Sequence, residues 1–193
     1  MADITHGTWI KDGKAVDSVY QGGAKVYGRN LAAGTSEPFV MLYGIPHTAW
    51  NAGKKRAEIS LPVTVKAWEV LPYKTFRCAV TPGITYMQSI YVSTDAPLTG
   101  TAVQVTWFDL SSGHDVAGKT DMLSISENVY RITSTYMWPD NSGNSNVFRA
   151  FDIYNFARVF DLSKGTFLYF YQPKLELGTV ATPYSLAPED VLK

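Results

Sequence analysis

The sequence predicts an all-β fold, a jelly-roll β-sandwich preceded by a short N-terminal β meander. Short segments rich in Val, Ile, Thr, Tyr, Phe and Trp are separated by Gly, Pro, Asn, Asp and Ser, which is the pattern of strands and turns. No window of a dozen residues repeats apolar residues at helical spacing. Because the strand segments are short and regularly spaced, they favour a sandwich of two sheets over other all-β folds.

The main domain is expected to span residues 31–182. Its predicted strands cover residues 39–45, 57–61, 63–68, 73–80, 85–93, 102–109, 129–137, 147–154 and 166–172. Residues 110–119 and 140–146 are polar and rich in turn-forming residues, so both are predicted to be surface loops.

The two ends of the chain have patterns of their own. Asp12-Gly13 and Gly22-Gly23 are typical two-residue hairpin turns, so residues 1–30 are predicted to form a three-stranded meander. A meander of this size buries too little apolar surface to be stable alone, and we expect it to pack on its own domain, on a sister subunit or on another protein. The tail, residues 183–193, contains two prolines and is expected to run extended over the surface or to leave the domain.

Composition excludes several function classes. Lys+Arg and Asp+Glu are 17 each, so the formal net charge is zero, which disfavours nucleic acid as a partner. The apolar stretches are only a few residues long, far short of the roughly 20 that a membrane span needs. The single cysteine, Cys78, excludes an intramolecular disulfide and a cysteine-based metal cluster.

The sequence lacks the motifs of common catalytic sites. His6, His47 and His114 do not have metal-binding spacing, and the chain has no nucleophile elbow or phosphate loop. Among the candidate carboxylates only Asp152 lies inside a predicted strand, whereas glycoside hydrolysis needs a pair. We therefore predict a protein that is not an enzyme and has no catalytic cofactor.

Aromatic residues are abundant, with 12 Tyr, 9 Phe and 5 Trp, or 13% of the chain. Most aromatic side chains of a sandwich fill its core, but an exposed ring offers a flat surface to the C–H face of a sugar. In residues 85–93 alternation places Tyr86, Ile90 and Val92 on one face with Gln88, and Tyr91 on the other. The excess of aromatic residues therefore favours one ligand-binding aromatic patch.

The stretch from Phe170 to Asp190, FYQPKLELGTVATPYSLAPED, closely resembles the ending of carbohydrate-binding-module-like jelly rolls in tail and baseplate proteins of phages infecting Gram-positive bacteria. Residues 19–31, VYQGGAKVYGRNL, resemble the leader that precedes such modules, and residues 82–92 and 103–113 resemble two of their strands. The resemblance implies a protein of the virion, on its tail, baseplate or capsid surface, that binds a host cell-wall saccharide and contacts other virion proteins. Because phage fibres are usually closed cyclic assemblies, we expect a homotrimer to which residues 1–30 contribute.

The predicted saccharide site is a shallow groove that combines aromatic rings with arginines. Its aromatic residues are expected to point away from the core, and Trp138 lies just before the polar loop 140–146. An arginine fork can bridge adjacent hydroxyls or an anionic substituent. The predicted site residues are Tyr91, Arg131, Trp138, Arg149, Tyr154 and Tyr171.

Modules of the kind that the sequence resembles often hold a structural calcium. Glu37 and Glu176 lie near the two ends of the predicted domain and are the oxygen ligands considered for at most one such ion. Two other interpretations stay open: a purely structural decoration or assembly subunit with no sugar site, and the binding module of a cell-wall hydrolase.

Overall fold

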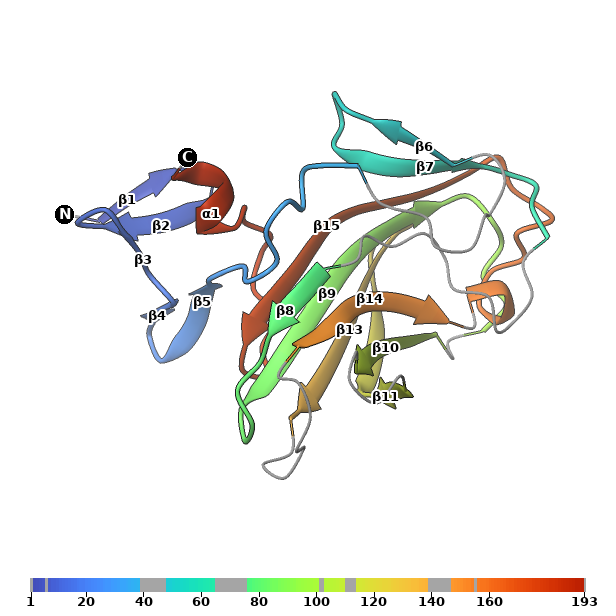
Figure 1. The fold of residues 1–193 in the computed structure, drawn as a ribbon. Helices are drawn as coiled ribbons and strands as arrows, with labels where there is room; N and C mark the ends of the chain where they lie inside the picture. The colour runs from blue at the N-terminus through green and yellow to red at the C-terminus, as the bar shows by residue number, and fades with distance from the viewer. Residues whose placement is uncertain are drawn as a thin grey trace.

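The computed structural model describes residues 2–5, 7–38, 48–64, 76–100, 103–109, 114–138, 147–154 and 156–192. Two stacked β-sheets form the main body, and both chain ends form a smaller unit beside it (Figure 1). In these residues the helical segments are the short 3₁₀ turn η1 (Phe156–Arg158) and the short helix α1 (Pro188–Val191), so the predicted all-β class is confirmed. The predicted strand 39–45, residues 65–68 of the predicted strand 63–68, and the predicted loop 140–146 lie outside the described residues.

The larger sheet has six antiparallel strands in the order β12-β13-β9-β15-β7-β6. The strands are β6 (Thr48–Asn51), β7 (Arg56–Ser60), β9 (Thr85–Thr94), β12 (Lys119–Ser126), β13 (Val129–Met137) and β15 (Phe167–Leu177). β15 continues beyond the end predicted at residue 172. Gln172 has a φ of 54° and the register shifts between Tyr171 and Lys174, so a bulge admits Pro173, which has no N–H for the ladder.

The smaller sheet has the order β11-β10-β14-β8. Its strands are β8 (Phe76–Ala79), β10 (Gln104–Asp109), β11 (His114–Ala117) and β14 (Val147–Tyr154). β10 lies close to β13, and β14 to β9, so this sheet packs on one face of the larger sheet. With β7, β15, β9 and β13 in one layer and β8, β14, β10 and β11 in the other, the strands follow the jelly-roll order, and the predicted topology is confirmed.

One predicted loop is wrong in part. The segment 110–119 was expected to lack regular structure, but residues 114–117 form β11 and β12 begins at Lys119. Both are edge strands of their sheets, and β12 exposes most of its side chains. Main-chain pairing with β13 therefore defines β12, because its mostly exposed side chains leave no hydrophobic alternation in the sequence.

The core lies between the two sheets. Along β9 the side chains of Tyr86, Ile90 and Val92 belong to the core cluster, whereas Met87 is buried outside it and Tyr91 is half-buried, as the predicted alternation requires. On one side of this core Phe156 of η1 stacks on Phe160, with ring centroids 4.8 Å apart. Tyr91 consequently faces away from the smaller sheet, and we call that side of the larger sheet the outer face.

The N-terminal residues form two small sheets instead of one meander. β1 (Ala2–Thr5), β2 (Thr8–Lys11) and β3 (Lys14–Ala15) form the first, and β4 (Ser18–Gln21) and β5 (Ala24–Gly28) form the second. The predicted turns at Asp12-Gly13 and Gly22-Gly23 are present, with positive φ at all four residues. The meander is interrupted after Ala15, since the carbonyl of Asp17 accepts a hydrogen bond from the N–H of Arg29 (2.8 Å).

The two stretches that carried the family resemblance contact each other. The N–H of Gly28 donates to Thr182 Oγ1 (3.1 Å), Asn30 Nδ2 donates to the carbonyl of Ser185 (3.0 Å), and the N–H of Leu31 donates to the carbonyl of Leu175 (2.7 Å). The tail ends in α1, next to β2, and both chain ends lie together in Figure 1. The N-terminal segment therefore packs on its own chain, the first of the three partners expected for it.

Candidate functional site

One row of neighbouring residues crosses the outer face of the larger sheet. Strand register aligns, from β12 to β6, the residues Leu123, Arg131, Tyr91, Tyr171, Arg56 and Asn51. Directly paired residues point to the same face of a sheet. The structure thus brings together three of the six predicted site residues: Arg131, Tyr91 and Tyr171.

Two tyrosines form the centre of this row. The rings of Tyr91 and Tyr171 are stacked, with centroids 5.6 Å apart and an interplanar angle of 21°, and both side chains are half-buried. Burial raises the pKa of the Tyr171 hydroxyl, and neighbouring Tyr91 adds to this. The Tyr171 hydroxyl is therefore uncharged, and the stacked pair is an aromatic surface that suits a ligand with both an apolar face and polar groups.

A third tyrosine and an arginine extend the surface toward β7. The Arg56 guanidinium lies 3.6 Å from the ring centroid of Tyr169, and Arg56 Nε donates to Glu58 Oε1 (2.6 Å). Asn51 Nδ2 donates to the same oxygen (3.0 Å). This arrangement orients Arg56 beside Tyr171.

Sequence reasoning missed Arg56 and Tyr169. The alternation along β7 would have identified its polar face, because Arg56, Glu58 and Ser60 alternate with the buried residues Ala57 and Ile59.

Two adjoining hollows surround Tyr171. Lys54, Tyr171 and Gln172 line both of them. The first, of about 300 Å³, is also lined by Lys55, Tyr184 and Leu186, and the second, of about 420 Å³, by Arg56 and Ser93. We call the combined surface the tyrosine groove, lined by Lys54, Lys55, Arg56, Ser93, Tyr171, Gln172, Tyr184 and Leu186, with Tyr91 stacked on Tyr171.

Local backbone features hold the two walls of the groove. On one side, Asn51 Oδ1 accepts a hydrogen bond from the N–H of Lys54 (3.0 Å) and Lys55 has a φ of 50°, so the β6–β7 turn presents consecutive basic residues. On the other side, the Tyr184 hydroxyl is hydrogen-bonded to Thr35 Oγ1 (2.8 Å). The groove thus lies between a hairpin turn and the C-terminal tail.

Arg131 does not have the role that the sequence predicted. Its Nη1 donates to the carbonyl of Ala181 (3.1 Å), while Nη2 donates to the carbonyl of Thr182 and to Ser89 Oγ (3.1 Å). The guanidinium also lies 5.4 Å from the ring centroid of Tyr91. Because its terminal nitrogens are used within the protein, the prediction of a sugar-binding fork is wrong. Arg131 instead fixes the tail beside Tyr91.

Trp138 is a core residue. Its side chain is 3% exposed and meets Tyr136 edge-on, with centroids 5.7 Å apart. Its backbone N–H donates to the carbonyl of Ile84 (3.1 Å), and its carbonyl accepts from the N–H of Gly83 (2.7 Å). The chain therefore turns this indole inward at the end of β13, and the prediction of an exposed platform is wrong.

Arg149 and Tyr154 lie in the other layer of the sandwich. Both belong to β14, where Arg149 pairs with Phe108 and Arg77, and Tyr154 pairs with Gln104. β14 belongs to the smaller sheet, which packs on the face opposite to the outer face. The prediction that one groove unites all six residues is therefore wrong. Alternation in the sequence indicates on which face of its strand a residue lies, but it does not indicate to which sheet the strand belongs.

Glu176 is buried among cations and hydroxyl or amide donors. Its Oε2 lies 3.0 Å from Lys25 Nζ and accepts from Thr182 Oγ1 (2.8 Å). Its Oε1 accepts from the N–H of Thr182 (2.8 Å) and lies 3.9 Å from Lys174 Nζ. Both oxygens are thus occupied, and the prediction of Glu176 as a calcium ligand is wrong. Glu37 is exposed on the turn that follows β5, and its role as an ion ligand stays a prediction.

Within the described ranges no group of three or more His, Cys, Asp and Glu residues is placed to hold a metal ion. In the same ranges, no helix is long and apolar enough to cross a membrane.

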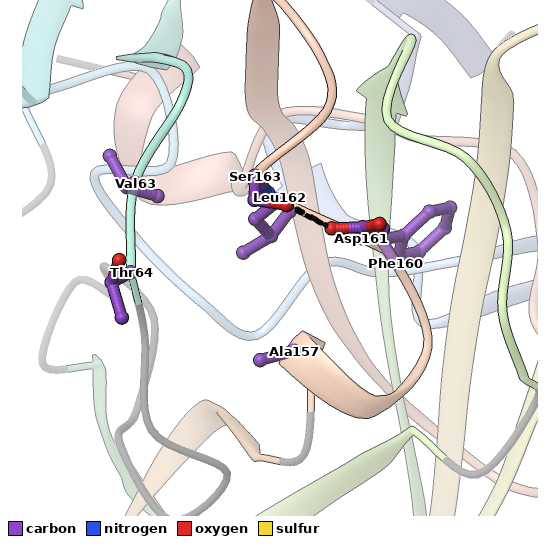
Figure 2. Close-up of a pocket in the computed structure, with 7 residues that line it drawn as sticks. All are labelled: Val63, Thr64, Ala157, Phe160, Asp161, Leu162 and Ser163. Carbon is purple, nitrogen blue, oxygen red and sulfur yellow. Dashed lines mark hydrogen bonds between the residues drawn. The ribbon is translucent and has the colours of Figure 1, made fainter.

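A third hollow, of about 180 Å³, lies at the rim of the sandwich and is lined by Val63, Thr64, Ala157, Phe160, Asp161, Leu162 and Ser163. Figure 2 shows the hydrogen bond between Ser163 and Asp161 at its edge. Asp161 also pairs with Lys164 (3.0 Å), and these partners lower the pKa of its carboxyl. Phe160 is fully buried, so this hollow offers no open aromatic surface and is a weaker candidate than the tyrosine groove.

No protein-family model matches the chain, and no curated protein matches it. A search of solved structures finds a chain titled "CBM4 structure and function", which aligns over 64% of this chain and 72% of its own length, at 16% identity and a TM-score of 0.40.

Proposed function

We propose that this protein binds a saccharide in the tyrosine groove and carries out no reaction there. The observation that supports this most is the stacked pair Tyr91 and Tyr171 on the outer face, ringed by Arg56, Ser93 and Gln172. Aromatic rings accept the C–H face of a pyranose, and the surrounding hydroxyl, amide and guanidinium groups hydrogen-bond its hydroxyls. The two adjoining hollows beside Tyr171 suit a ligand of more than one sugar.

The setting that we propose follows from the sequence. The leader and the ending resemble those of phage tail and baseplate modules, so the saccharide is proposed to belong to a host cell wall and the protein to a virion surface. Contacts with other virion proteins and the homotrimer are part of the same proposal. Tyr20 and Val26 on the β4–β5 hairpin are 64% and 40% exposed, and they offer apolar surface for such contacts.

A glycan array and a binding assay on intact host cells test this function. Tyr171→Ala is expected to lower saccharide affinity about tenfold, since one aromatic contact contributes roughly 1–2 kcal/mol. Leu98→Ala is the control, because it removes an exposed hydrophobic side chain that lies outside both the groove and the proposed contact surface. Loss of binding in both variants would contradict the groove as the site.

The array also separates the alternatives. A folded wild-type protein that binds no glycan and no cell would favour the purely structural decoration or assembly subunit. Binding to peptidoglycan fragments, with no binding to other cell-surface sugars, would favour the binding module of a cell-wall hydrolase.

A further inference from the structure

Positive charge is concentrated on one side of the tyrosine groove. Lys54 and Lys55 on the β6–β7 turn are followed by Arg56 at the start of β7, and Lys54 lines both hollows. Both lysines are exposed, and neither forms an ion pair with a residue in the described part of the chain. The whole chain has 17 basic and 17 acidic residues, so this concentration of positive charge is local and does not follow from a basic composition.

The negative charge beside the groove is already neutralised. Glu58 Oε1 accepts hydrogen bonds from Arg56 Nε (2.6 Å) and Asn51 Nδ2 (3.0 Å). The Arg56 hydrogen bond also lowers the pKa of Glu58, so this carboxylate stays charged and offsets Arg56. The tyrosine hydroxyl of Tyr171 is neutral. Lys54 also lowers the pKa of Glu58 slightly through its charge, but neither Lys54 nor Lys55 has an ion-pair partner among the described residues, and both border an aromatic surface.

We propose that the tyrosine groove selects anionic polysaccharides, sugar polymers that carry phosphate or carboxylate groups. This rests on the proposed saccharide function and adds the class of ligand. A sugar ring stacked on Tyr171 would place its substituents toward the β6–β7 turn, where ammonium groups form charge-assisted hydrogen bonds with anionic oxygens. Because Lys54 borders both hollows, it reaches an anionic group on either of two successive sugars.

Affinity gel electrophoresis with two pairs of polymers tests this inference. Polygalacturonate is compared with its fully methyl-esterified form, and phosphomannan with neutral mannan, so each pair differs mainly in charge. The anionic member is expected to retard the protein more strongly, and the retardation is expected to fall as salt rises, since exposed charges are screened. The two pairs distinguish carboxylate from phosphate as the preferred anion.

Variants separate a specific site from general ion exchange. The double variant Lys54→Gln/Lys55→Gln is expected to weaken binding of the anionic polymer about three- to tenfold, as for two exposed charge contacts. Lys11→Gln/Lys14→Gln removes the same charge from exposed lysines of the N-terminal sheet and is expected to have no effect. Tyr171→Ala is expected to weaken binding of every polymer that is bound.

Each outcome decides between the two proposals. Equal binding of charged and neutral polymers overturns the inference and leaves the saccharide function standing. Equal losses in the two double variants, or full binding by Tyr171→Ala, also overturn it, because the polymer is then held by general charge attraction. Binding of none of the four polymers overturns the inference, and the glycan array then decides the function.

Discussion

The outer face of the larger sheet has two halves that differ in what covers them. In the covered half, Lys174 and Glu176 of β15 lie beneath the chain ends and are fully buried. In the open half, Arg56 and Glu58 of β7 are 19% and 27% exposed and border a groove. Both halves contain an acid and a base beside a tyrosine. The two halves therefore differ in how deeply these groups are buried and in what they contact, and not in residue type. The covered half holds the fold together, whereas the open half is accessible to a ligand.

The covered half depends on a cluster that joins three segments. Lys174 Nζ donates to Thr182 Oγ1 (2.7 Å) and to the carbonyl of Pro183 (2.6 Å), while Lys25 Nζ donates to Glu176 Oε2 (3.0 Å). We call Lys25, Lys174, Glu176 and Thr182 the terminal cluster. A Cβ atom on Gly28 would collide with Glu176 Oε2, so glycine is required where β5 passes the cluster.

The largest effect is expected for the acid of the terminal cluster. Glu176→Gln leaves the ammonium groups of Lys25 and Lys174 with no buried counter-charge, which should cost about 3–5 kcal/mol in the free energy of unfolding. Glu58→Gln is the matched change in the open half and should cost about 1 kcal/mol or less. Urea unfolding of both variants measures the difference. Equal costs would remove the distinction between the two halves.

An equally direct contrast concerns the aromatic residues. Trp138→Ala empties a core position and should cost about 3–5 kcal/mol of stability. Tyr171→Ala loses a stacked but half-buried ring and should cost about 1 kcal/mol, with its main effect on binding. Thermal and urea unfolding measure the two costs, and a Tyr171→Ala variant that unfolds at 25 °C would assign this ring to the core.

Local patterns predicted much of this structure. Alternation along residues 85–93 correctly separated Tyr91 from buried Ile90, and the turn dipeptides located two of the three N-terminal hairpins. Sequence patterns did not, however, predict which of the two sheets each strand would join. Arg149 and Tyr91 alternate in similar ways but belong to different sheets. Likewise, Arg131 has the right face for a ligand, but the distant carbonyls of Ala181 and Thr182 occupy it.

Alkaline pH is expected to change the stability that the covered half contributes. Burial lowers the pKa of Lys174 from 10.5 to about 8, so between these values the unfolded chain binds more protons than the folded protein. This residue's contribution to the free energy of unfolding therefore rises from about pH 8 toward pH 10.5, and it is lost as the pH falls through about 8. Urea unfolding of wild type and Lys174→Met across this range measures the difference. Parallel profiles for the two proteins would contradict the assignment to Lys174.

The smallest effect on stability is expected in the open half. Arg56→Gln removes the contact with Tyr169 and the ion pair with Glu58, which should together cost about 1 kcal/mol. The hydrogen bond from Arg56 lowers the pKa of Glu58, so Glu58 contributes stability above its unfolded pKa that is lost as the pH falls through its folded pKa. The variant should therefore have a Glu58 pKa closer to 4.5, measured by NMR titration of the carboxyl.

Lys119→Gln, in the exposed pair with Asp121 (3.8 Å), is the control and should leave both stability and the Glu58 pKa unchanged. An unchanged Glu58 pKa in Arg56→Gln would show that Asn51 alone orients this carboxylate, and Arg56 would then be free to turn toward a ligand.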